Sequence, residues 1–309
     1  MIQLLLILNI TFMYSAPLIF AALGGVISEK SGVVNLALEG LMTIGAFIAV
    51  LVAHKTGDPF IGFLAAGFSG MLLCLLHAFA SITLKADQTI SGIALNLMGP
   101  GLALFLSRIF FEGSVMTTPV PRTIPKILTF LGVSVEGDVV LQNLNIDLTV
   151  FIALLIAALM YFVFYKTKWG LRVLAVGEHP QAADSLGINV YKVRYACVLL
   201  SGFLAGLGGA ACSLAIVAIF SPTIISGKGF IALAAVIFGK WKPHGAVLAC
   251  LLFGFAQALV VVLGGTSLDI SPHLLSMIPY VLTLLILIAF VGKSVAPKSS
   301  GQPFEKGIR

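Results

Sequence analysis

Four polar residues lie within or beside long apolar stretches, where a side chain either contacts a solute or binds another part of the protein. Glu39 and Asn35 are four positions apart and share one face of a helix. A carboxylate there is costly unless it is paired, hydrated or protonated. Glu39 is therefore either a structural anchor, paired with a residue such as Lys30, or part of a pathway or gate. Asn96 and Gln257 lie deeper and either form interhelical hydrogen bonds or face a pore.

No arrangement of residues typical of catalysis is present. The sequence contains no Walker A, H-E-x-x-H or G-x-S-x-G motif. Its four cysteines are scattered through apolar segments without metal-ligand spacing, which indicates packing residues (Cys74, Cys197, Cys212 and Cys250). His77 is the only histidine in its apolar segment, which is more typical of a histidine hydrogen-bonded inside a helical bundle than of a metal ligand. We therefore expect no catalytic residue, no metal site and no cofactor on this chain.

The composition predicts a polytopic membrane protein. The 309 residues are 59% hydrophobic and 10% charged, with a mean hydropathy of +1.11, whereas soluble domains carry about 25% charged residues. Backbone groups must be paired inside a lipid bilayer, so we expect an all-α transmembrane helical bundle of about eight to ten spans. The net charge of +6 indicates cytoplasmic loops rather than nucleic-acid binding.

A single transmembrane domain is expected over residues 1–292. The apolar runs predict spans at about 2–27, 34–54, 59–84, 88–110, 147–165, 193–220, 224–240, 245–264 and 273–292. The run at 224–240 is short, and Gly227 and Gly229 weaken its start as a helix. A broken or re-entrant helix is the alternative there, because such backbone is tolerated inside protein or beside a cavity.

Basic residues predict the orientation of the chain in a plasma membrane. With the first loop in the cytoplasm, five of the 18 Lys and Arg residues fall outside, namely Lys55, Arg108, Arg122, Lys126 and Lys228. The N-terminus is then outside and the tail at 293–309 is cytoplasmic, and its polar composition predicts disorder. The longest loop, 111–146, is external and is either a contact surface for an external partner or a passive connector.

Residues 166–194 are a polar stretch between two apolar ones and carry five basic side chains, Lys166, Lys168, Arg172, Lys192 and Arg194. Pro180 suits the first position of a helix, and Gly187 suits its end. Between them Ala182, Ala183 and Leu186 give a short helix with a small surface. This pattern favours a segment that seats in a groove of a partner over a simple connecting loop.

Three segments carry a resemblance to a known family. They are NLALEGLMTIGAF, VGEHPQAADSLGINV and GFIALAAVIFGKWKPHGA. They resemble permeases of ABC importers of the branched-chain amino acid and simple-sugar class, which includes ribose permeases. Their sequences are most similar to those of nucleoside-type permeases, and the resemblance runs from about residue 15 to 292. It implies a fold like that of type II ABC-importer permeases.

The resemblance also implies function and partners. It implies an importer driven by separate ATPase subunits that bind ATP and Mg²⁺, with a second permease chain of a different paralogue and an extracytoplasmic substrate-binding lipoprotein. The contact with the ATPase would involve Gly177, Glu178, Ala182, Ala183, Gly187 and Ile188. The expected solute is a nucleoside, with riboflavin or a simple sugar as alternatives. An ion-coupled secondary transporter and a membrane enzyme are the competing hypotheses from other classes.

Overall fold

The computed structural model describes residues 2–135, 137–264, 271, 274–275, 277–279, 281–282, 285 and 295–306. By length and composition, seven helices of this part of the chain are able to cross a membrane. They are α1 (Ile2–Lys30), α2 (Leu38–Thr56), α3 (Pro59–Ala78, continued by η1, Phe79–Thr83), α4 (Gln88–Phe110), α7 (Leu148–Lys166), α10 (Val190–Ala210, continued by η2, Ala211–Ile216) and α12 (Pro243–Gly264). The shorter helices are α5 (Ile127–Phe130), α6 (Val139–Leu144), α8 (Lys168–Glu178), α9 (Pro180–Ser185) and α11 (Lys228–Phe238). The all-helical transmembrane fold is confirmed; the span expected at 273–292 falls largely outside the described residues.

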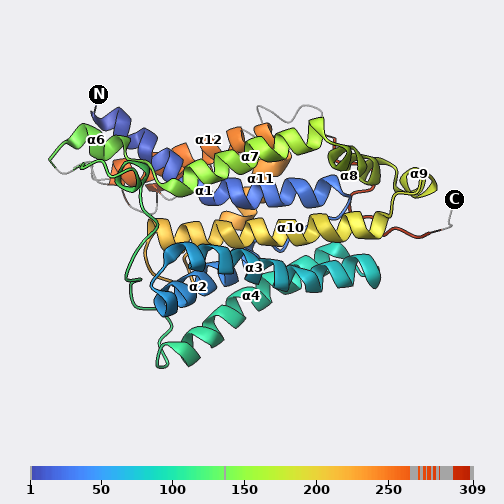
Figure 1. Ribbon diagram of the computed structural model, residues 1–309, viewed down its shortest axis with the longest axis horizontal. Coiled ribbons are helices and arrows are strands. Elements are labelled where there is room, and N and C mark those ends of the chain that lie inside the picture. Colours follow the sequence, from blue (N-terminus) through green and yellow to red (C-terminus); the bar gives the residue numbers. More distant parts are fainter. Residues whose placement is uncertain are drawn as a thin grey trace.

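Helices α1 and α10 form the centre of the bundle (Figure 1). Helices α2, α3 and α4 lie on one side of them, and α7, α11 and α12 lie on the other. Helices α8 and α9 and the C-terminal tail gather at one end of the bundle, whereas α6 and the N-terminus lie at the opposite end. The two ends are called here the α8–α9 end and the α6 end.

Glycine allows the central helices to approach each other at backbone distance. A Cβ atom on Gly206 of α10 would lie 2.2 Å from the carbonyl oxygen of Ala66 in α3, and one on Gly45 of α2 would lie 2.5 Å from the carbonyl oxygen of Gly206. Small residues stabilise helix association in lipid because packing, rather than hydrophobic burial, drives it. Gly206 is therefore the point at which three helices touch.

Two segments inside the bundle are not long helices. Residues 31–37 connect α1 to α2, with Val33, Asn35 and Ala37 fully buried. Residues 217–227 lead into α11, which has 11 residues. A helix of that length spans about 16 Å, about half of the hydrocarbon core of a bilayer. The broken-helix alternative for 224–240 therefore describes the structure, and both irregular segments need partners for their backbone groups.

We predict that Gly206→Ala lowers the stability of the purified protein by roughly 3 kcal/mol, because the new methyl group overlaps backbone atoms that cannot move aside. Melting in detergent, followed by intrinsic fluorescence, measures the change. Gly101→Ala in α4 is the matched control, since a Cβ atom there meets nothing within 4 Å. Equal melting temperatures for the two variants would contradict this packing.

Candidate solute cavity and coupling surface

Side chains of α3 and α4 satisfy the buried backbone at Val34, in the connection between α1 and α2. The Gln88 side-chain oxygen accepts a hydrogen bond of 2.7 Å from the Val34 N–H. A ring nitrogen of His77 lies 3.0 Å from the Val34 carbonyl oxygen, and the other ring nitrogen lies 3.0 Å from the Ser91 hydroxyl. His77 thus has a structural place between α3, α4 and the connection, as a buried histidine of a bundle would.

Asn35 and Asn96 also contact this connection. Asn96 donates to the carbonyl oxygen of Leu36 at 2.7 Å and accepts from the Gly40 N–H at 2.9 Å. The fully buried Asn35 donates to the Ser201 hydroxyl of α10 at 2.9 Å. Both amides therefore form hydrogen bonds between different elements, and both hold the start of α2 in position.

Glu39 joins the beginnings of two helices. It lies in the first turn of α2, and its two carboxylate oxygens accept hydrogen bonds of 2.7 Å from the N–H groups of Gly227 and Gly229. These donors belong to the N-terminus of α11, where the helix dipole favours a negative charge. A Cβ atom on Gly229 would lie 2.4 Å from the Glu39 nitrogen, so glycine is required for this approach. The contacts are those of an anchor, and its partner is α11 rather than Lys30.

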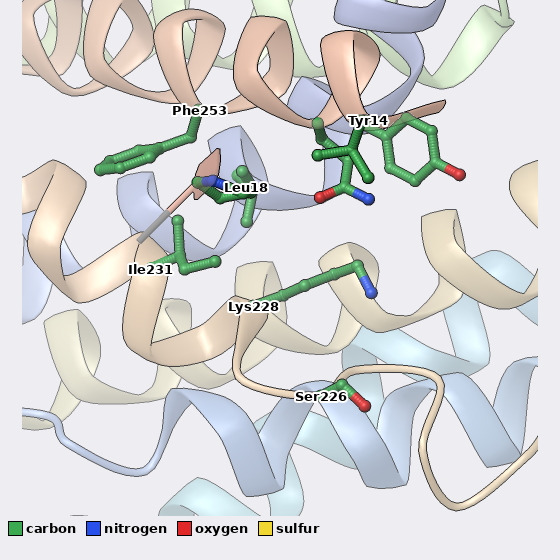
Figure 2. A pocket seen from close by; sticks show the side chains of 9 residues that line it. Tyr14, Leu18, Ser226, Lys228, Ile231 and Phe253 are labelled. Atoms are coloured by element: carbon green, nitrogen blue, oxygen red, sulfur yellow. The ribbon is translucent and has the colours of Figure 1, made fainter. Parts of the chain in front are cut away.

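A cavity of about 230 Å³ lies beside this junction, between α1, α11 and α12 (Figure 2). Its described lining residues are Tyr14, Leu18, Ser226, Lys228, Ile231, Phe253, Gln257, Val260 and Pro279. The Lys228 side chain extends from the start of α11 into this space (Figure 2). Its ammonium group donates to the carbonyl oxygens of Ile224 and Ile225 at 2.7 and 3.2 Å. The cavity is therefore largely apolar, with a few polar groups of different chemistry.

Tyr14 and Gln257 are half-buried, and within the described part of the chain neither side chain forms a hydrogen bond. Tyr14 lies near the middle of α1, and Gln257 lies well inside α12. An unpaired polar group at membrane depth is expensive unless it meets water or a solute. These two side chains therefore offer hydrogen-bonding groups to water or to a molecule in the cavity.

The loop expected at 111–146 packs against the end of α10. The backbone N–H groups of Thr117, Val120 and Ile124 donate to the carbonyl oxygens of Phe220, Ala218 and Leu214. These bonds cover the irregular segment that leads into α11. The first part of the loop is thus built into the α6 end of the bundle.

At the opposite end, the residues expected to contact an ATPase do not share one surface. Gly177 is buried against the end of α1, where a Cβ atom would lie 2.1 Å from the Lys30 carbonyl oxygen. Ala183 is 2% exposed, whereas Ala182 and Gly187 are exposed. Two further residues of this set, Glu178 and Ile188, are half-buried. The exposed part of the set therefore lies on α9 and the turn after it, where Leu186 is 81% exposed.

The C-terminal tail crosses this end of the molecule in contact with α8, α9 and α10. Ser299 donates from its backbone N–H to the Gly177 carbonyl oxygen at 3.0 Å, and the buried Arg194 donates to the Gln302 carbonyl oxygen at 3.0 Å. Phe304, 4% exposed, packs with Val176, Ala183 and Val190. Residues 295–306 are thus packed, which corrects the expectation of a disordered tail. Composition alone does not reveal the apolar site that receives Phe304.

An exposed ion pair closes the tail onto the end of α3. The Lys85 ammonium group lies 2.7 Å from the Glu305 carboxylate. The hydrogen bond to Glu305 raises the pKa of Lys85 and so favours its charged form. Both side chains are well exposed, and such pairs add little to stability. The buried contacts of Ser299, Arg194 and Phe304 therefore hold the tail in place.

Comparison with known proteins places the chain in a family. Residues 6–287 match the model of a family described as the permease component of the branched-chain amino acid transport system. The chain belongs to this family. The permease is 45% identical to the guanosine ABC transporter permease protein NupQ of Bacillus subtilis, with 98% of each chain covered. It is 44% identical to the nucleoside ABC transporter permease protein NupC of Lactococcus lactis, with 95% of this chain and 94% of NupC covered.

More distant relatives bear on the assembly and the fold. A second nucleoside ABC transporter permease protein of Lactococcus lactis, NupB, is 25% identical, with 94% of this chain and 81% of NupB covered. A solved metal-chelate type ABC transporter in an inward-facing conformation has a TM-score of 0.51 at 14% identity, with 91% of this chain and 85% of that chain covered. At that identity the likeness concerns the fold alone. The permease is therefore a multi-pass membrane component of an ABC importer.

The members of the predicted pathway set lie at different places in the structure, and two further residues, Tyr14 and Lys228, line the cavity. Of that set, Gln257 lines the cavity, whereas Asn35, Glu39 and Asn96 bind backbone or side chains around it. Tyr14 and Lys228 were missed. A tyrosine inside a long apolar helix was the available indication for the first. Lys228 was placed with the external basic residues, but it projects into the interior because α11 starts inside the bundle.

We predict that Glu39→Gln destabilises the permease by about 1–3 kcal/mol, because the amide group offers one acceptor where the carboxylate offers two and leaves a backbone N–H unpaired. Thermal unfolding and solute uptake are measured together, and both fall if Glu39 is an anchor. Glu112→Gln, at an exposed position in the loop after α4, is the matched control. A stable protein with altered uptake would instead assign Glu39 to the pathway.

Proposed function

We propose that this permease carries nucleosides and that the cavity between α1, α11 and α12 is part of their route. The observation that supports this most is that Tyr14 and Gln257, which line the cavity, form no side-chain hydrogen bond with the described residues. A nucleoside is uncharged and rich in hydrogen-bonding groups, which suits a cavity with apolar walls and few polar contacts. The two relatives named for nucleoside and guanosine transport, each more than 40% identical, support the same solute class.

The energy for transport comes, in this proposal, from a separate ATPase that binds ATP and Mg²⁺. The chain has no phosphate-binding loop of the Walker A type. A second, paralogous permease completes the route, as the presence of NupB beside NupC in Lactococcus lactis suggests. An extracytoplasmic binding lipoprotein delivers the solute. The α8–α9 end faces the cytoplasm of a prokaryotic cell, and the N-terminus lies outside, in agreement with the distribution of basic residues.

Helix α1 provides a direct mechanical path from the α8–α9 end to the cavity. Its last turn touches Gly177 of α8, and Tyr14 lies in its middle. Near the same end, the Trp241 indole donates to the Glu29 carboxylate of α1, just beyond the C-terminus of α11. ATP-driven movement of α8 and α9 would therefore shift α1 and α11 together. Tyr14 and Lys228 lie on these two elements and would move with them.

Uptake assays test the solute class and the energy source. The permease is assembled with its ATPase, second permease and lipoprotein in vesicles, and labelled nucleosides, riboflavin and simple sugars are offered in turn. We expect nucleoside uptake that requires ATP. Uptake of only riboflavin or sugar would reject the nucleoside proposal, and uptake by the permease alone under an ion gradient would indicate a secondary transporter.

We predict that Gln257→Leu slows nucleoside uptake about 2- to 10-fold at limiting solute, because one hydrogen bond to the passing molecule is lost. The initial rate is compared at equal amounts of permease in the membrane. Gln142→Leu makes the same change at an exposed position of α6 and leaves the rate unchanged. Equal rates for both variants would remove Gln257 from the route.

We predict that Leu186→Glu abolishes the stimulation of ATP hydrolysis by solute while the permease still inserts, because an exposed apolar contact with the ATPase becomes charged. Leu131→Glu places the same change at an exposed leucine of the α6 end. Leu186 is a better probe than Ala183, which is buried, or Gly187, whose φ of +82° disfavours any side chain. Normal coupling in Leu186→Glu would exclude α9 as the docking element.

A further inference from the structure

The cavity holds a cationic group in an otherwise uncharged lining. Among the described residues that line it, Lys228 is the one with a formal charge. Two of its three N–H donors are directed to the carbonyl oxygens of Ile224 and Ile225. The third donor remains for a molecule in the cavity. This leaves a fixed hydrogen-bond donor of strongly positive character at the wall formed by α11.

The structure balances this charge without occupying the remaining donor. The carboxylate of Glu39 binds the backbone N–H groups of Gly227 and Gly229, the two neighbours of Lys228 in the chain. Among the described residues, the Lys228 ammonium group is in no ion pair within 4.0 Å. The negative charge thus lies behind the first turn of α11, while the lysine side chain extends into the cavity (Figure 2).

The other lining residues suit a flat ring. Leu18, Ile231, Phe253 and Val260 provide apolar walls, and Tyr14 and Gln257 provide hydrogen-bonding groups. A purine base has two apolar faces and a polar edge. Lysine pairs favourably with the O6 and N7 acceptors of guanine, whereas adenine presents an amino donor at position 6 that an ammonium group repels.

We propose that Lys228 selects nucleosides whose base carries a carbonyl oxygen at position 6, such as guanosine and inosine, over those with an amino group there. This inference rests on the proposed nucleoside route and adds the residue that chooses among purines. Lys228 would donate to O6 of the base, the acceptor that adenine lacks, with the ring between the apolar walls. Adenosine would leave its amino group against the ammonium group and would enter less readily.

Two pairs of solutes isolate the contact at position 6. Guanosine is compared with 2,6-diaminopurine riboside, and inosine with adenosine, by competition against labelled guanosine in vesicles with the complete transporter. The unchanged permease is expected to prefer the 6-oxo member of each pair. Binding of all four solutes to the lipoprotein is measured separately, since variants of the permease leave that preference unchanged.

Three substitutions at Lys228 then give distinct expectations. Lys228→Met is expected to reduce the preference for the 6-oxo solutes about 5- to 150-fold, the factor that one good base contact contributes. Lys228→Arg is expected to retain the preference. Lys228→Gln is expected to move it toward adenosine, because a glutamine amide pairs with N6 and N7 of adenine. Lys242→Met, at an exposed lysine beyond the C-terminus of α11, is the control and leaves the preference unchanged.

The outcomes separate this inference from the proposed function. If no nucleoside is taken up by the unchanged transporter, the proposed route fails. If nucleosides are taken up and the ratios within both pairs stay the same in Lys228→Met and Lys228→Gln, Lys228 does not select the base and the inference alone fails. Should Lys228→Met be absent from the membrane, an unchanged ratio in Lys228→Gln is sufficient to overturn it.

Discussion

The contact between Glu39 and the N-terminus of α11 is the interaction on which the interior of this permease depends. Two helices, α2 and α11, begin at irregular segments beside the central helices, and each has backbone N–H groups at its start that no helical bond satisfies. One carboxylate at the start of α2 accepts from two of the N–H groups at the start of α11. This single residue therefore stabilises the irregular segment before α11 by pairing its backbone N–H groups. It also fixes the position of the first turn of α11, from which Lys228 projects.

The same constraint explains the polar residues of α3, α4 and α10. The connection before α2 is buried and lacks helical hydrogen bonds, so Gln88, His77, Asn96 and Ser201 are placed around it. What looks in the sequence like a scattered set of candidate pore residues is largely a scaffold for non-helical backbone. At the cavity, by contrast, the Gln257 side chain forms no hydrogen bond to the described residues.

The sequence predicted the long helices well, because uninterrupted apolar length determines what can span a bilayer, and three motifs indicated the family. Gly227 and Gly229 correctly indicated a weak helix start. The partner of Glu39 was not predictable, because it lies about 190 residues away and is bound through backbone groups that any sequence possesses. Lys228 was placed at a surface because counting basic residues treats each lysine near a helix end as part of a loop. The packed tail was missed for a similar reason, since the burial of Phe304 depends on α8 and α9 being adjacent.

The bonding of Glu39 also bears on the source of energy. An ion-coupled carrier needs a group in the membrane that exchanges its ion or proton during each cycle. Both oxygens of Glu39 already bind the N-terminus of α11, so releasing them would unpair two partly buried N–H groups. A carboxylate bonded in this way suits a structural role better than the exchange of an ion or a proton. Contacts connect α8 through Gly177 to α1, and α1 through Glu29 and Trp241 to the far end of α11. A motor outside the membrane that pushes on α8 and α9 would therefore act at once on α1 and α11, two of the helices that line the cavity.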